Sequence, residues 1–133
     1  MRACVGQEDI QVFHSVGPQT WERIGSPLSA FGDLTPARQA RIQATASGKV
    51  FVTWHEFDGN TDTGYVHLFT SYWDNQAWSS LTTSAGINQG QQNCIRPMLS
   101  IDSFGRPVVA WFESRGGGDD FAGDYVYVRR YNN

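Results

Sequence analysis

The sequence predicts an all-β protein built from short antiparallel strands that recur along one domain of 133 residues. Aromatic residues make up 14% of the chain, and 14 glycines and 5 prolines supply turns between strands. Apolar and polar side chains alternate in several short segments, which is the period of a β-strand. A set of residues that recurs at one spacing predicts how these strands are grouped.

Four pairs of informative residues are each separated by 57 positions. They are Trp21 and Trp78, Gly48 and Gly105, Trp54 and Trp111, and Glu56 and Glu113. The coincidence of such residue types at one spacing indicates an internal repeat. We therefore expect a single domain, residues 1–133, with two repeats of about 57 residues at approximately 21–77 and 78–133.

Each repeat is expected to contribute strands in a fixed order. The first is short and runs into a glycine-containing turn, the second ends on Trp-x-Glu, the third follows a polar loop, and the fourth begins near a tryptophan. The expected strands are 41–46, 50–56, 65–72 and 77–81, then 98–102, 108–113 and 125–131. Segments 10–15 and 20–24 look like a further third and fourth strand, which gives nine strands in all.

Residues 99–113 read apolar-Ser-Ile-Asp-x-x-Gly-x-Pro-Val-Val-Ala-Trp-x-Glu. This pattern resembles the blade repeats of bacterial β-propellers, especially the sialidase-like group. Blades of that group often carry an Asp-box, Ser-x-Asp-x-Gly-x-Thr-Trp, between the third and fourth strands. Here Ser71 and Trp78 are kept, but Trp73, Asn75 and Ala77 stand where Asp, Gly and Thr belong. The resemblance implies a propeller-like architecture far more than an activity.

Two blades cannot close a propeller, which usually has about four to eight. They would leave strand edges and apolar faces exposed. We therefore expect a homo-oligomeric ring in which 20–24 of one chain completes the blade begun by 96–131 of the next. Three chains would give six blades, and two chains, the lower-ranked arrangement, would give four. The alternative is a single-chain β-sandwich of two sheets, which can dimerise through an edge.

Charge and apolar patterning exclude several classes of partner. The net charge is −3, and Lys49 is the only lysine, so there is no basic stripe for nucleic acid. No apolar run approaches the roughly 20 residues of a membrane span, and the first residues show no export signal, so localisation is not assigned. Cys4 and Cys94 are expected to be free thiols. No cofactor is expected.

Three tryptophans are candidate ligand contacts. Trp54 and Trp111 end the second strands, where packing between blades is the first interpretation and a platform for sugar stacking is the second. Trp73 is expected in a turn, where core packing is less favoured, which makes it the more interesting contact to a ligand or partner.

Glu56 and Glu113 occupy the same place in the two repeats. Paired carboxylates are what glycoside hydrolysis needs. Because equivalent positions lie on different blades, a structural role is favoured, with Arg41 and Arg96 as the candidate partners of the two carboxylates. Together with the three tryptophans, these four residues make up the candidate ligand-binding set.

Two acidic loops and three histidines complete the candidates. Segment 58–64 spaces oxygen ligands as calcium loops do, but it lacks the glycine and glutamate such loops need, so a solvated turn and no metal are expected. The acidic, glycine-rich loop 115–124 could become ordered on a ligand or cation. His14, His55 and His67 have no metal-like spacing and are interpreted as structural.

These observations favour a non-catalytic, self-assembling, propeller-like binding protein, with carbohydrate as the first candidate ligand. The alternative is a structural or protein-interaction module without a small ligand. A glycoside hydrolase related to sialidases ranks third.

Overall fold

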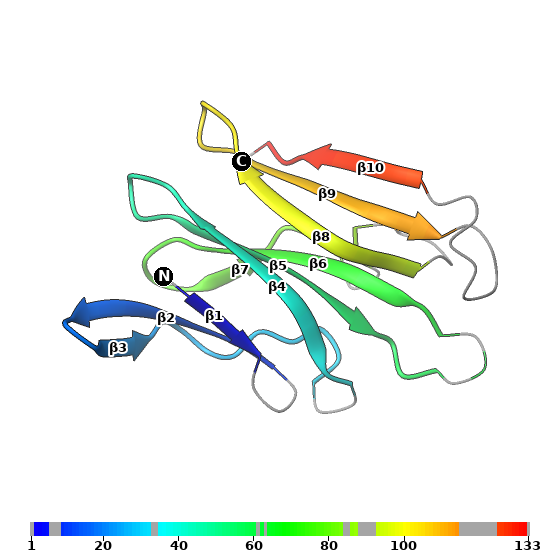
Figure 1. The fold of residues 1–133 in the computed structure, drawn as a ribbon, viewed down its shortest axis with the longest axis horizontal. Helices are drawn as coiled ribbons and strands as arrows, with labels where there is room; N and C mark the ends of the chain where they lie inside the picture. The colour runs from blue at the N-terminus through cyan, green and yellow to red at the C-terminus, as the bar shows by residue number, and fades with distance from the viewer. Residues whose placement is uncertain are drawn as a thin grey trace.

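The computed structural model describes residues 2–5, 9–32, 35–60, 62, 64–83, 86–87, 93–114 and 125–132. These residues form ten β-strands in three antiparallel sheets, and no helix occurs among them. The sheets follow one another in chain order, from the blue N-terminal sheet to the yellow and red C-terminal sheet (Figure 1). The all-β, antiparallel expectation is confirmed.

The first sheet has the order β1-β2-β3, with β1 at Arg2–Val5, β2 at Ile10–Gly17 and β3 at Thr20–Arg23. The expected count of nine strands is wrong, because β1 is an additional strand that pairs antiparallel with β2. Strand β1 has only four residues, too few for the alternation by which strands are recognised in a sequence. Strand β3, at the edge of this sheet, pairs with β2 of its own chain.

The second sheet has the order β4-β5-β6-β7, with β4 at Ala37–Ala44, β5 at Val50–Phe57, β6 at Val66–Trp73 and β7 at Trp78–Ser80. The third has the order β10-β9-β8, with β8 at Asn93–Ile101, β9 at Pro107–Ser114 and β10 at Tyr125–Arg130. The expected strands of both repeats coincide with these elements apart from their ends. The acidic loop 115–124 lies outside the described residues.

Two backbone irregularities recur 57 residues apart. Strand β4 shifts register between Arg38 and Arg41, and β8 does so between Ile95 and Met98. Each shift contains a residue with positive φ, Gln39 at 51° and Arg96 at 54°, although such φ values are uncommon outside glycine. The turns that follow these strands also match, with φ of 88° at Gly48 and 76° at Gly105.

Two hydrophobic cores separate the three sheets. The core between the first and second sheets includes Ile10, Val12, Val52, Trp54 and Phe69. The core on the other side of the second sheet is formed by Leu68, Ile87, Cys94, Val109, Trp111 and Tyr131. Strands β4, β5 and β6 all contact β8, so the middle sheet is covered on both faces, unlike either sheet of the two-sheet sandwich considered above.

Candidate functional site

Glu56 is fully buried and accepts four hydrogen bonds. Oε1 accepts from the Ser29 hydroxyl at 2.8 Å and from the backbone N–H of Phe31 at 3.0 Å. Oε2 accepts from the backbone N–H of Ala30 at 2.9 Å and from Trp54 Nε1 at 3.0 Å. A buried carboxylate is stable in the interior when its oxygens are satisfied in this way.

This carboxylate holds residues 29–31, which leave the first sheet, against the end of β5. The expected pairing of Glu56 with Arg41 is wrong: Arg41 lies opposite Thr53 in the β4–β5 register, and strand alternation puts Thr53 and Glu56 on opposite faces. The exposed Arg41 instead donates to the Ala40 carbonyl. Glu56 therefore has no exposed oxygen with which to meet a ligand.

Glu113 and Trp111 occupy the equivalent positions on β9, and both are buried. The Trp111 ring stacks on Tyr127, with centroids 5.7 Å apart and planes 20° apart. Cys94 lies opposite Glu113 in the β8–β9 register. It is a buried free thiol, as expected for Cys94, and burial and the Glu113 charge raise its pKa. Arg96 lies exposed in the β8 bulge.

Trp73 is the last residue of β6, so its expected place in a turn is wrong. Its ring packs on Trp78, with centroids 5.5 Å apart, and contributes to the first core. Trp78 Nε1 donates to the Ile24 carbonyl at 3.1 Å, which joins the second sheet to the end of the first. The strand predicted from the sequence ended at Tyr72, one residue too early. Because β6 continues through Trp73, this side chain packs in the core and is not an exposed ligand contact.

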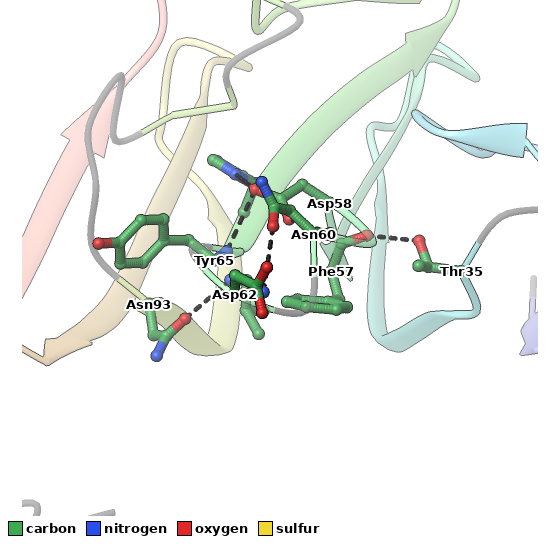
Figure 2. A network of polar contacts seen from close by, with 9 residues as sticks. Thr35, Phe57, Asp58, Asn60, Asp62, Tyr65 and Asn93 are labelled. Carbon is green, nitrogen blue, oxygen red and sulfur yellow. Dashed lines mark hydrogen bonds and ion pairs between the residues drawn. The ribbon is translucent and has the colours of Figure 1, made fainter. Parts of the chain in front are cut away.

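The loop after β5 is organised by Asp58 (Figure 2). Its Oδ1 accepts from the Asn60 N–H at 3.0 Å, and its Oδ2 accepts from the Tyr65 N–H at 3.1 Å and lies 3.2 Å from His67 Nε2. Burial works to raise the pKa of Asp58, but these hydrogen bonds and the His67 contact outweigh it and lower the pKa. The same end of the sheet is fixed by Asn93, whose side-chain oxygen accepts from the Val66 N–H at 2.8 Å.

The Asp58 loop thus uses its oxygens to accept hydrogen bonds from its own backbone, as a solvated turn does. Within the described ranges, no three His, Cys, Asp or Glu side chains gather in a group that could hold a metal ion. The described part of the chain also has no helix long and apolar enough to cross a membrane.

Two clefts lie beside the sheets. The first, about 330 Å³, has Trp54 and Phe69 among its walls, together with hydroxyl groups of β6 and β7 and the segment that leaves the first sheet. Its lining residues are Pro27, Leu28, Ser29, Ala30, Trp54, Phe69, Ser71, Ser80, Thr82 and Thr83. Of the sequence-predicted candidates, Trp54 lines this cleft.

The second cleft, about 350 Å³, lies where three turns of the second and third sheets meet. It is lined by Thr45, Ser47 and Lys49 of the β4–β5 turn, Asp74 and Asn75 of the β6–β7 turn, and Phe104, Gly105 and Arg106 of the β8–β9 turn. Sequence reasoning missed this set, although Gly48 of the first turn and Gly105 of the third are 57 residues apart in the sequence.

Comparison with known protein families, curated proteins and solved structures finds no match to the chain. The resemblance of the repeats to sialidase-like propeller blades therefore stays a prediction from the sequence.

Proposed function

We propose that the chain is a non-catalytic, propeller-like binding protein that assembles head to tail with further copies of itself. The observation that carries this proposal is the uncovered apolar face of the third sheet. Met98, Val126 and Val128 are 63%, 62% and 66% exposed, and they lie opposite Ala110 and Phe112 in the sheet registers. Contiguous apolar surface of this kind marks an interaction site.

The 57-residue spacing indicates what should cover this face. Phe51 and Thr53 of β5 are fully buried, on the face of the second sheet that is turned toward the third. Their equivalents on β9 are Val108 and Ala110, on the uncovered face. Since the equivalent face of the second sheet is covered by another sheet, we expect the face of the third sheet to be covered by another sheet too.

The surface that we expect to cover the third sheet of another copy is the face of the first sheet that is turned away from the second sheet. Trp21 lies opposite Ser15 in the β2–β3 register, three residues from the buried Val12, and is therefore on the face turned away from the second sheet. It is 39% exposed, and its equivalent Trp78 packs on the preceding sheet through the bond to Ile24. We propose that this face of one copy covers the third sheet of the next.

Burying the exposed apolar face of the third sheet would contribute favourable free energy to assembly. Burying an apolar side chain contributes about 1.5–3 kcal/mol when it is fully exposed beforehand. Three side chains that are about two-thirds exposed therefore contribute roughly 3–6 kcal/mol, as an upper bound. With three sheets per chain, two copies supply six blades, within the usual range, so the dimer now ranks above the trimer.

Light scattering on the purified protein tests the assembly. We expect a homo-oligomer that becomes a monomer when Val126 and Val128 are both changed to lysine. The control is Gln76→Lys, an exposed residue in the β6–β7 turn of the middle sheet and on neither proposed face, which should leave the oligomer intact. A wild-type protein that stays monomeric at micromolar concentration would show that the proposal is wrong.

A mixing experiment tests the head-to-tail geometry. Trp21→Lys blocks one face, and the Val126/Val128 lysine variant blocks the other. Each variant alone should be monomeric. The mixture should form a one-to-one heterodimer, because the third sheet is unaltered in the Trp21 variant and the first sheet is unaltered in the Val126/Val128 variant. Assembly of Trp21→Lys by itself would instead indicate pairing of two third sheets.

Carbohydrate remains the first candidate ligand, supported by clefts that combine aromatic rings with hydroxyl, amide and charged groups. A glycan array separates this function from an interaction module without a small ligand. Binding to none of the glycans would favour the interaction module. The glycoside hydrolase alternative gains no support from Glu56, because both of its carboxylate oxygens are buried and already accept hydrogen bonds from the protein. Turnover of a fluorogenic sialoside that is abolished by Glu113→Gln would support that alternative instead.

A further inference from the structure

The second cleft has the shape of a small-ligand site. Its volume of about 350 Å³ falls in the lower part of the range of ligand pockets. Three turns from two sheets form its walls, so the packing of the sheets creates it. The turns are held by their own hydrogen bonds: Lys49 N–H to Thr45 Oγ1 at 3.1 Å, and Gln76 and Ala77 N–H to Asp74 Oδ1, both at 2.9 Å.

The charges around the cleft balance. Arg106 Nε donates to Asp102 Oδ2 at 2.8 Å, which neutralises that guanidinium. Lys49 and Asp74 are the second pair of opposite charges, and both line the cleft. The backbone N–H groups of Ala77 and Gln76 keep the pKa of Asp74 below its ordinary value, so this carboxylate is ionised at neutral pH. A site with no excess charge favours a neutral ligand over an anion or a cation.

The groups that face the cleft suit vicinal hydroxyls. Asp74 Oδ1 is occupied by the two backbone N–H groups, which leaves Oδ2 to accept from a ligand hydroxyl. Lys49 Nζ lies 4.7 Å from the centre of the Tyr72 ring and carries N–H groups that can donate to a second hydroxyl. The Asn75 amide can do both.

Phe104 adds an apolar platform. Its side chain is 80% exposed, and the Arg106 guanidinium carbon lies 4.8 Å from its ring centre. An exposed aromatic ring held beside polar groups matches a sugar, which has an apolar C–H face and a polar rim.

We propose that this cleft binds a neutral sugar, with Phe104 under the apolar face of the ring and Asp74, Asn75 and Lys49 at its hydroxyls. The site rests on the binding function proposed above and names its ligand class. Trp73, Trp111 and the two repeated glutamates take no part in it.

Ligand-observed NMR tests the site. The probes are glucose, galactose, mannose and N-acetylneuraminic acid, each at millimolar concentration with the full-length protein. We expect saturation transfer to at least one neutral hexose. Phe104→Ala should weaken binding roughly tenfold, and Asp74→Asn, which keeps the Oδ1 acceptor of the turn, should weaken it as well. Ser103→Ala, an exposed neighbour in the same turn, should have no effect. Added salt should leave binding of the neutral sugar unchanged.

Three results would overturn the site: no transfer to any neutral hexose, binding that persists in both the Phe104 and Asp74 variants, or binding of the acidic sugar alone. Light scattering on the same samples separates the two proposals. Absence of sugar binding by an oligomeric wild-type protein rejects the site alone, whereas a monomeric wild-type protein rejects the assembly and leaves the sugar site to its own test.

Discussion

Trp54 Nε1 donates a hydrogen bond at 3.0 Å to Oε2 of Glu56, two residues further along the same strand. Residues i and i+2 share one face of a strand, so the indole and the carboxylate lie side by side between the first two sheets. The Trp-x-Glu sequence is therefore a structural unit here. Its tryptophan fills the core, and its glutamate holds residues 29–31.

Glu56→Gln should destabilise the fold by about 2–3 kcal/mol. The glutamine NH2 would replace one carboxylate oxygen and face two donors, which leaves buried N–H or O–H groups without an acceptor. Denaturant unfolding measures the loss. Glu22→Gln, an exposed glutamate on β3, is the control. Equal stability of the two variants would mean that the four hydrogen bonds of Glu56 are not important for the fold.

Asp58 should make stability depend on acid pH. Its pKa is lowered from 3.8 in the fold, so the ionised form contributes stability above that value and the contribution is lost as pH falls through 3.8 and then through the folded pKa. Asp58→Asn should therefore be less stable than wild type at pH 7, and the difference should shrink below pH about 4. Thermal unfolding across this range checks it, and a pH-independent difference would contradict it.

Cys94 should be unreactive in the native protein. The thiolate is the reactive form, and burial together with the Glu113 charge raises the pKa of this thiol. In a Cys4→Ser background, a disulfide reagent at pH 8 should label the native chain slowly and the denatured chain rapidly. Fast labelling without denaturant would show that the second core opens readily around Cys94.

Gly25→Ala should destabilise the contact between the first and second sheets. A Cβ there would lie 2.4 Å from Trp78 Nε1 and 2.8 Å from Trp73 Cζ3, at a φ of 67°. Gly32 has a similar φ of 62° with open space around it, so Gly32→Ala measures the backbone cost alone, about 1–2 kcal/mol. The larger loss in Gly25→Ala should come with a change in tryptophan fluorescence. Equal losses would mean that the two indoles move aside without cost.

Much of the fold could be predicted from the sequence because its strands alternate strongly and its tryptophans recur. Strands β5 and β9 were found nearly at their true ends. The N-terminal strand β1 was missed because four residues carry too little periodicity.

The site was harder to predict. Three of the four donors of Glu56 lie 25–27 residues away in the chain, in a segment with no strand pattern. The second cleft joins turns that only the packing of two sheets brings together, so no local spacing in the sequence could reveal that Asp74 and Phe104 share a cleft.

Each sheet consists of strands that are consecutive in the chain, and the sheets are stacked in the same order. The protein can therefore fold as it leaves the ribosome, one sheet at a time, because every strand of a sheet pairs with a strand that directly precedes or follows it in the chain. Each finished sheet is the template on which the next one packs. The outer face of β8, β9 and β10 is the template that the third sheet offers, and it exists as soon as these three strands have paired.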